Sequence, residues 1–184
     1  SGLKNKGAIT TDNGTVCRGL YETAAGRFFG VWGNTLVEIL SNESQIDRNS
    51  SLRFVKVGGN VSMADNGSQL MIVDDGKGYI YNFAADTIVE ITDADFPANA
   101  NQVVFNDGYF LVSVPDTKRF YISGLNDGLT WNALGFASMV SSPDNIIGLM
   151  EANTDVWMFG EKSIEVWENT GIDATVPYER REGA

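Results

Sequence analysis

The chain has 184 residues, of which 43% are hydrophobic, 13 are basic and 24 are acidic, so its formal net charge is −11. That length suits one domain, and the negative charge disfavours nucleic-acid binding through a basic face. With no histidine and one cysteine, Cys17, the chain excludes imidazole bases, histidine-ligated metals, intrachain disulfides and thiolate clusters. No apolar run approaches the roughly 20 residues of a membrane span. Residues 1–4 resemble neither an initiator nor a signal peptide, so we expect a soluble fragment or processed product.

Four hairpin-like segments follow one another along the chain, each with two apolar runs around a short turn. They cover residues 27–40, 69–83, 109–123 and 156–167. Their turns contain Gly33-Asn34, Asp74-Asp75-Gly76, Pro115-Asp116 and Gly160-Glu161, which are residue types that suit hairpin turns. Counted from Gly33 to Asp75 to Pro115 to Gly160, successive turns lie 42, 40 and 45 residues apart.

Each hairpin is flanked by two shorter apolar runs. One precedes it, at 18–23, 61–66, 103–107 and 147–152, and one follows it, at 52–57, 87–92, 129–134 and 176–181. Four strands every ~40–45 residues are typical of β-propeller blades. We therefore predict an all-β fold, a β-propeller made of four-stranded antiparallel blades, with residues 1–184 forming the propeller or part of a larger one. About four blades are expected, at 18–57, 61–92, 103–134 and 147–181.

The second strand of each predicted blade is apolar on both faces, so both faces must be covered by neighbouring blades. An open arc would leave two such faces exposed, of the kind built from Phe28, Met71, Leu111 and Trp157, and we expect it to self-associate. Two longer connections interrupt the repeats. Residues 41–51 are polar and predict an exposed loop that could serve as a docking element, whereas 93–101 cross between blades with Phe96 as an anchor.

One motif supports the propeller fold. The segment G-L-N-D-G-L-T-W at 124–131 is close to the Asp-box of sialidase-type propellers, with Gly124 in place of the hydroxyl residue and Asn126 in place of the aspartate. It predicts a structural hairpin turn between the last two strands of a blade, with Trp131 in the core.

The candidate residues form no recognisable catalytic set. We therefore predict no catalytic, cofactor-binding or metal-binding residues, and we leave the partner-binding residues unassigned. Glu38, Glu90, Glu165 and Glu168 could supply a glycosidase pair, but the strand context of Glu38, Glu90 and Glu165 favours an exposed sheet face. The segment 74–78 favours a hairpin turn over a calcium loop. Cys17 has no base and is expected as a buried or edge thiol. Arg180-Arg181 is expected to be a solvated strand end.

Several longer segments resemble one family, the packaged-DNA stabilisation proteins of short-tailed phages, which are head-completion and tail-hub proteins. The C-terminal run F-G-E-K-S-I-E-V-W-E-N-T-G at 159–171, followed by P-Y-E-R at 177–180, is similar to a stretch of that family. Further similar segments are Arg18-Gly19-Leu20, 61–73, 78–81, 120–138 and 182–184, so the resemblance covers nearly the whole chain in consistent order.

The resemblance implies a structural virion protein and not an enzyme. It would dock below the portal, seal the DNA channel after packaging and link head to tail. The expected partners are portal, adaptor and tail proteins and further copies of itself, without cofactor, membrane or sequence-specific nucleic-acid binding. It would reside in the tail or neck of the virion after assembly in the host cytoplasm. The alternative is a glycan-binding or glycan-hydrolysing, sialidase-like propeller, which would need arginine, glutamate and tryptophan lining a central funnel.

Overall fold

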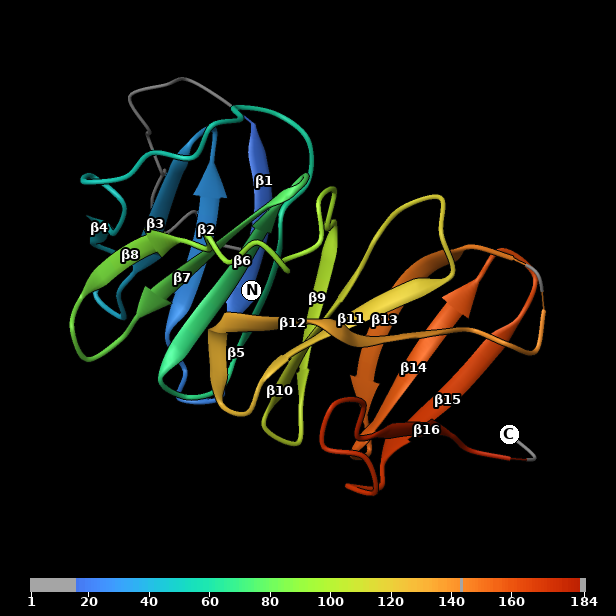
Figure 1. The fold of residues 1–184 in the computed structure, drawn as a ribbon. Coiled ribbons are helices and arrows are strands. Elements are labelled where there is room, and N and C mark those ends of the chain that lie inside the picture. Colours follow the sequence, from blue (N-terminus) through green and yellow to red (C-terminus); the bar gives the residue numbers. More distant parts are fainter. Residues whose placement is uncertain (1–15, 143, 183–184) are drawn as a thin grey trace, which may run out of the picture.

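The computed structural model describes residues 16–142 and 144–182, in which sixteen strands form four antiparallel sheets of four strands each. The sheets follow one another along the chain as blades around a common axis (Figure 1). The all-β prediction is confirmed, and within the described residues no helix is long and apolar enough to span a membrane.

Within every blade the spatial order of the strands is the order of the sequence, so each neighbouring pair is a hairpin. Blade 1 comprises β1 (Cys17–Glu22), β2 (Phe28–Trp32), β3 (Thr35–Ile39) and β4 (Gln45–Asp47). Blade 2 comprises β5 (Ser62–Asp65), β6 (Gln69–Asp74), β7 (Lys77–Asn82) and β8 (Thr87–Glu90). Blade 3 comprises β9 (Gln102–Asn106), β10 (Tyr109–Ser113), β11 (Arg119–Gly124) and β12 (Asp127–Ser138). Blade 4 comprises β13 (Ile146–Ala152), β14 (Asp155–Gly160), β15 (Ile164–Asn169) and β16 (Tyr178–Arg180).

The first strands of successive blades are the innermost ones, and they contact one another from β1 through β5 and β9 to β13. Hydrogen bonds join each to the next. The amide of Val61 donates to the Arg18 carbonyl at 3.0 Å, and that of Val103 donates to Ser62 Oγ at 3.0 Å. The amide of Leu149 donates to Gln102 Oε1 at 2.8 Å. These bonds fix the spacing of the blades at the axis.

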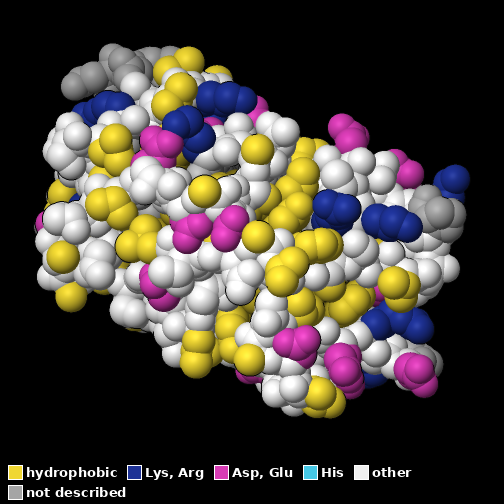
Figure 2. Space-filling model, viewed as in Figure 1, with side chains coloured by type: hydrophobic (Ala, Val, Ile, Leu, Met, Phe, Trp, Pro, Cys, Tyr) yellow, Lys and Arg dark blue, Asp and Glu magenta, His cyan; other side chains and the backbone are white. Residues whose placement is uncertain are grey.

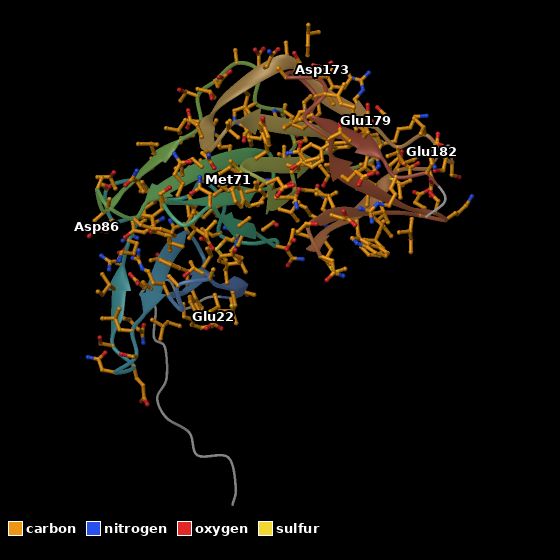
Figure 3. The ribbon with its side chains drawn as sticks, turned by 90° about the horizontal axis from the view of Figure 1, so that it is seen from below. Glu22, Met71, Asp86, Asp173, Glu179 and Glu182 are labelled. Carbon is orange, nitrogen blue, oxygen red and sulfur yellow. The ribbon has the colours of Figure 1, made fainter. Side chains whose placement is uncertain are left out.

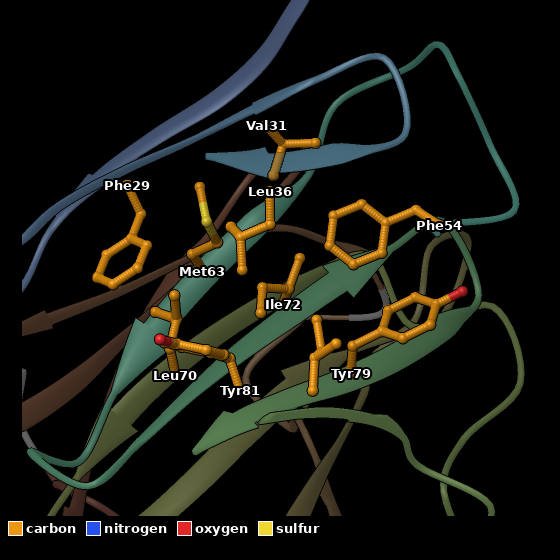
Figure 4. Close-up of a cluster of buried hydrophobic side chains, with 10 residues drawn as sticks. Phe29, Val31, Leu36, Phe54, Met63, Leu70, Ile72, Tyr79 and Tyr81 are labelled. Carbon is orange, nitrogen blue, oxygen red and sulfur yellow. The ribbon is translucent and has the colours of Figure 1, made fainter. Parts of the chain in front are cut away.

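Three clusters of buried hydrophobic side chains fill the spaces between successive blades. The first, between blades 1 and 2, contains Phe29, Leu36, Leu70 and Tyr79, each fully buried (Figure 4). Side chains alternate across a strand, so both faces of a blade contribute. On β6, Leu70 belongs to the first cluster and the adjacent Met71 to the second, between blades 2 and 3.

The four hydrophobic positions expected to face neighbouring blades divide into two groups. Met71 and Leu111 are fully buried, in the second and third clusters, and Figure 3 shows Met71 deep inside the molecule. Phe28 and Trp157 are only half-buried, because they lie on blades 1 and 4 and point away from the clusters. Among the described residues, none of the three clusters joins blade 4 to blade 1, so the blades form an open arc.

The prediction for the fourth strand of blade 1 is wrong. Residues 52–57 contain no strand; β4 is instead the short segment Gln45–Asp47, inside the stretch that was predicted to be an exposed loop. Beyond β4, Asn49 continues the pairing through its side chain, which accepts from the Leu36 amide at 2.8 Å and donates to the Asn34 carbonyl at 2.9 Å. Phe54 is buried against Tyr79, with ring centroids 4.8 Å apart, and so packs as a core anchor.

The Asp-box-like segment forms the predicted turn. Leu125 and Asn126 connect β11 to β12, and Asn126 adopts a φ of 54°. Trp131 is 8% exposed and donates from Nε1 to the Gly128 carbonyl at 3.0 Å. Phe96 meets the Trp131 ring edge-on at 5.0 Å, which confirms both as packing anchors.

Candidate functional site

The inner strands border two cavities, one toward each end of these strands. The first, of ≈ 570 Å³, lies at the start of β5 and β9 and is lined by Asn60, Ser62, Asp75, Gln102 and Leu149 among others. The second, of ≈ 340 Å³, lies at the opposite end and includes Tyr21, Asp65, Phe105 and Glu151. The second cavity brings all four blades together, and the first brings together blades 2, 3 and 4 and the connection that precedes blade 2, so this axial groove is the candidate functional site.

The second cavity has an acidic rim. Tyr21 Oη donates to Asp65 Oδ2 at 3.0 Å, and it accepts from the Asp65 amide at 3.2 Å. Burial, with the neighbouring Asp65 carboxylate, raises the pKa of Tyr21 to about 12. Glu151 is exposed, as is Glu22 at the end of β1. A neutral phenol and these carboxylates provide hydrogen bonds and negative charge at this rim.

At the other end of the axis, Arg18 joins blade 1 to blade 2. It is 3% exposed and forms an ion pair with Asp74 on β6. Its remaining donors bond three carbonyl oxygens, of Gly33, Lys56 and Gly59, each at 2.9 Å. Every hydrogen bond of this guanidinium is therefore directed at protein atoms, which gives Arg18 a structural role.

The sequence suggested neither member of this pair as structural. Arg18 appeared only in the family resemblance, and Asp74 only as part of a turn. A positional signal was available for Asp74 alone: it alternates on β6 with Leu70 and Ile72, which belong to the first cluster, so its side chain faces blade 1.

Glu38 was expected on an exposed sheet face, and that prediction is wrong. It is 4% exposed and accepts hydrogen bonds from two arginines. Arg27 Nε lies 2.7 Å from Glu38 Oε1 and Arg48 Nη2 lies 2.6 Å from Oε2. The hydrogen bonds from Arg27 lower the pKa of Glu38. Burial acts in the opposite direction, but Arg48 lowers the pKa further, so the net shift is downward. A carboxylate held ionised by two guanidinium groups cannot act as a general acid.

Glu165 is also buried, at 2% exposure, and again the expectation of an exposed face is wrong. Oε1 accepts from the amides of Val140 (2.8 Å) and Ser141 (2.5 Å), and Oε2 from Trp167 Nε1 (2.9 Å). Burial opposes ionisation, but the bonds from Ser141, Val140 and Trp167 outweigh it and lower the pKa of Glu165. Glu165 thus fastens the segment between blades 3 and 4.

The other two candidate carboxylates form partly exposed ion pairs. Glu90 pairs with Lys77 on the neighbouring strand. Glu168 Oε2 lies 3.0 Å from Arg181 Nη2, and Arg181 also contacts Asp155 at 2.7 Å. The side chain of Arg181 is 45% exposed, as expected for a solvated strand end, but it is also held by these two ion pairs. Each of the four glutamates has its own set of partners, so no two of them form the carboxylate pair of a glycosidase.

The remaining groups that the sequence raised take structural positions. Asp75 and Gly76 form the turn between β6 and β7, with φ values of 41° and 99°, as expected for the segment 74–78. Cys17 is exposed on β1, an edge strand of its sheet. Within residues 16–142 and 144–182, no three Asp, Glu, Cys or His side chains group in a way that could hold a metal ion.

Comparison with solved structures shows similarity to propeller-like proteins. The chain is 12% identical to virginiamycin B lyase from Staphylococcus aureus, with a TM-score of 0.65 over 94% of this chain and 57% of that one. The extracellular domain of a putative one-component system from B. thetaiotaomicron gives 11% identity and a TM-score of 0.58, over 90% of this chain and 21% of that one. The computationally designed Ika4 protein gives 9% and 0.57, over 84% and 91%.

At such low identity these similarities show the fold alone. The chain spans just over half of the lyase and about a fifth of the one-component-system chain. No curated protein sequence matches it. A family model described as bacteriophage P22 Gp10, beta-propeller, matches residues 2–184. This chain therefore belongs to the P22 Gp10 family of phage stabilisation proteins, a family of β-propellers with a structural role in the phage.

Proposed function

We propose that this protein docks below the phage portal and seals the DNA channel after packaging, linking head to tail. The observation that carries the proposal is the family match over residues 2–184. The architecture is consistent with a mechanical role: four rigid sheets are fastened by three hydrophobic clusters and by buried polar contacts at the axis.

The candidate carboxylates support a role other than catalysis. Glu38 and Glu165 are buried and ionised, and each already accepts three hydrogen bonds or more from the protein. A glycosidase acid must instead carry a proton near neutral pH and face its substrate. We propose that these residues stabilise the blades and that the protein's partners are portal, adaptor and tail proteins.

A phage whose genome lacks this coding sequence tests the proposal. We expect heads to fill with DNA at the normal rate and then to lose it, so that nuclease-resistant DNA rises and falls during a time course. Complementation with the parent gene should restore retention. The proposal fails if mutant particles keep a nuclease-resistant genome, or if packaging itself does not begin.

A further inference from the structure

A third cavity, the side pocket, lies away from the axis at the end of blade 3 where β11 turns into β12. It has a volume of ≈ 260 Å³ and is enclosed between blade 3 and the loop 170–177, which connects β15 to β16. Tyr109, Leu125 and Trp131 line it from blade 3, and Ala174 and Thr175 line it from the loop. The side pocket is therefore built by two adjacent blades and shares no lining residue with the axial groove.

The side pocket presents apolar surface to solvent. Ile122 and Trp131 line it from the core, at 3% and 8% exposure, whereas Leu125 stands in the β11–β12 turn and is 62% exposed. Ile172, on the facing loop, is 75% exposed. Small-molecule sites usually exceed ~300 Å³, so a pocket of this size suits a single anchoring side chain of a protein partner.

Two aspartates adjoin the side pocket directly. Asp127 pairs with the lining residue Gly124 across the turn, and Asp173 precedes the lining residues of the loop, at the surface of the molecule (Figure 3). Asp127 Oδ1 accepts from the Leu129 amide at 2.9 Å, and Asp173 Oδ1 accepts from the Thr175 amide at 2.7 Å. The Oδ2 atom of each carboxylate has no hydrogen-bond donor among the described residues, so both can accept from a partner.

A third carboxylate, that of Asp107, lies near the same pocket. Burial raises the pKa of Tyr178, and the Asp107 carboxylate raises it further, which places the two side chains close together. Tyr178 in turn packs edge-on against the lining residue Tyr109, with ring centroids 6.2 Å apart. Asp107 is exposed, so its charge faces solvent beside the pocket.

The chain's own cations do not neutralise these three aspartates. Arg181 pairs with two other carboxylates of blade 4, and Arg180 Nη1 lies 3.5 Å from Ser141 Oγ, beyond the opposite end of β12. The segments around the side pocket, 106–109, 124–132 and 170–177, contain no lysine or arginine. Within residues 16–142 and 144–182 none of the three aspartates forms an ion pair, so an apolar pocket is surrounded by three uncompensated negative charges.

We propose that the side pocket binds a basic segment of a partner protein, which inserts one apolar side chain beside Leu125 and places flanking lysine or arginine residues against the three aspartates. Burial of the apolar side chain supplies affinity, and the opposite charges orient the segment and reject acidic competitors. The same charges repel the phosphates of a nucleic acid. The site is separate from the axial groove, and its test does not depend on the role proposed above.

Fluorescence anisotropy of a labelled peptide, K-K-G-W-G-K-K, titrated with the chain tests the proposal. Two further peptides separate the two contributions: K-K-G-A-G-K-K lacks the apolar anchor, and E-E-G-W-G-E-E reverses the charge. We expect the first peptide to bind, the second to bind roughly tenfold more weakly and the third not to bind. Binding of the first should weaken as salt rises, because salt screens exposed charges.

Charge variants locate the site. The double variant Asp107→Asn with Asp173→Asn removes two exposed charges beside the pocket but keeps an acceptor oxygen at each turn, so folding should persist, which far-UV circular dichroism would verify. Its control, Asp116→Asn with Glu161→Gln, removes two exposed charges from the turns at the opposite ends of blades 3 and 4. We expect the first variant to weaken binding of K-K-G-W-G-K-K by roughly threefold to tenfold, and the control to leave it nearly unchanged.

Leu125→Ala removes apolar surface from the pocket without changing its charge. It should weaken binding of the tryptophan peptide severalfold and leave binding of the alanine peptide unchanged. The proposal is overturned if the control charge variant weakens binding as much as its counterpart, if the tryptophan and alanine peptides bind equally, or if the parent binds neither at millimolar concentration. Displacement of the bound peptide by an excess of methyl glucoside would also overturn it, because the pocket would then belong to a sugar.

Discussion

Arg18 on β1 and Asp74 on β6 form an ion pair that joins blade 1 to blade 2, with side chains 0% and 1% exposed. Removing one partner of such a pair leaves a charge without compensation in a dry environment. Replacing Arg18 with leucine also deprives three carbonyl oxygens of their donor. We expect Arg18→Leu to lower the free energy of unfolding by ~3–5 kcal/mol, measured by urea denaturation with tryptophan fluorescence.

A surface pair provides the control. Lys77 and Glu90 are 45% and 30% exposed, and Lys77→Met should lower the free energy of unfolding far less than Arg18→Leu does, because solvent screens an exposed pair. Equal effects of Arg18→Leu and Lys77→Met would show that the buried pair contributes no more than a solvated one.

Glu165 gives a second prediction, because all three groups that contact its carboxylate are donors. Glutamine has the same shape but places an NH₂ group against either the Val140 and Ser141 amides or the Trp167 indole. We expect Glu165→Gln to cost about 1–3 kcal/mol in the free energy of unfolding, measured by urea denaturation. Glu168→Gln, at a 42% exposed position on the same strand, should change it little.

The pH dependence of stability follows from the same carboxylate. The pKa of Glu165 is lower in the folded chain than its ordinary value of 4.5, so the unfolded state binds the proton more readily. Its contribution is therefore complete above about pH 4.5 and is lost as the pH falls through the folded-state pKa. We expect the parent to lose stability below that pH, and Glu165→Gln to show a shallower loss when urea midpoints are compared between pH 7 and pH 3. Parallel pH profiles would contradict this account.

Much of the fold could be predicted from the sequence because each hairpin has its own turn residues and its own alternating apolar strands. The short β4 was the exception: Gln45–Asp47 has one apolar residue, and its pairing continues through the Asn49 side chain, which no strand pattern reveals. The apolar residues Leu52 and Phe54, expected in a strand, contribute to the first cluster from a loop.

The polar interior could not be predicted in the same way. Glu38 and Glu165 each stand between apolar residues on a strand, as an outward-facing residue also would. Their burial depends on partners from other segments, such as Arg48 for Glu38 and the Val140 amide for Glu165. Composition and periodicity carry no information about which distant donor meets a carboxylate.

Gly30 provides a third prediction, since the Trp32 ring packs over it on the face of blade 1 that points away from blade 2. A Cβ at this position would collide with the indole and lie 2.9 Å from Leu20 Cδ2. We expect Gly30→Ala to displace the indole, to shift the tryptophan emission to longer wavelength and to cost ~1–3 kcal/mol in the free energy of unfolding. Gly58→Ala is the control, because nothing lies within 4 Å of its added Cβ. An unshifted spectrum in Gly30→Ala would show that the ring does not pack there.

The last prediction concerns DNA, which the protein should not bind directly although its family stabilises packaged genomes. Binding to a duplex requires lysine and arginine side chains that can displace counterions. Five of the seven arginines, at 18, 27, 48, 53 and 181, already pair with carboxylates of the protein. On the face shown in Figure 2, Lys and Arg lie in several separate groups, with acidic side chains between them.

With a net charge of −11, the chain should therefore give no electrophoretic retardation of a duplex probe at physiological salt and micromolar protein. A basic DNA-binding protein of similar size serves as the positive control. Arg53→Gln, which removes an arginine whose side chain is 40% exposed, should leave the result unchanged. Retardation that weakens steeply as salt rises, and weakens again in Arg53→Gln, would instead show that this surface holds the duplex by its phosphates, and the protein would then stabilise DNA by contact with it.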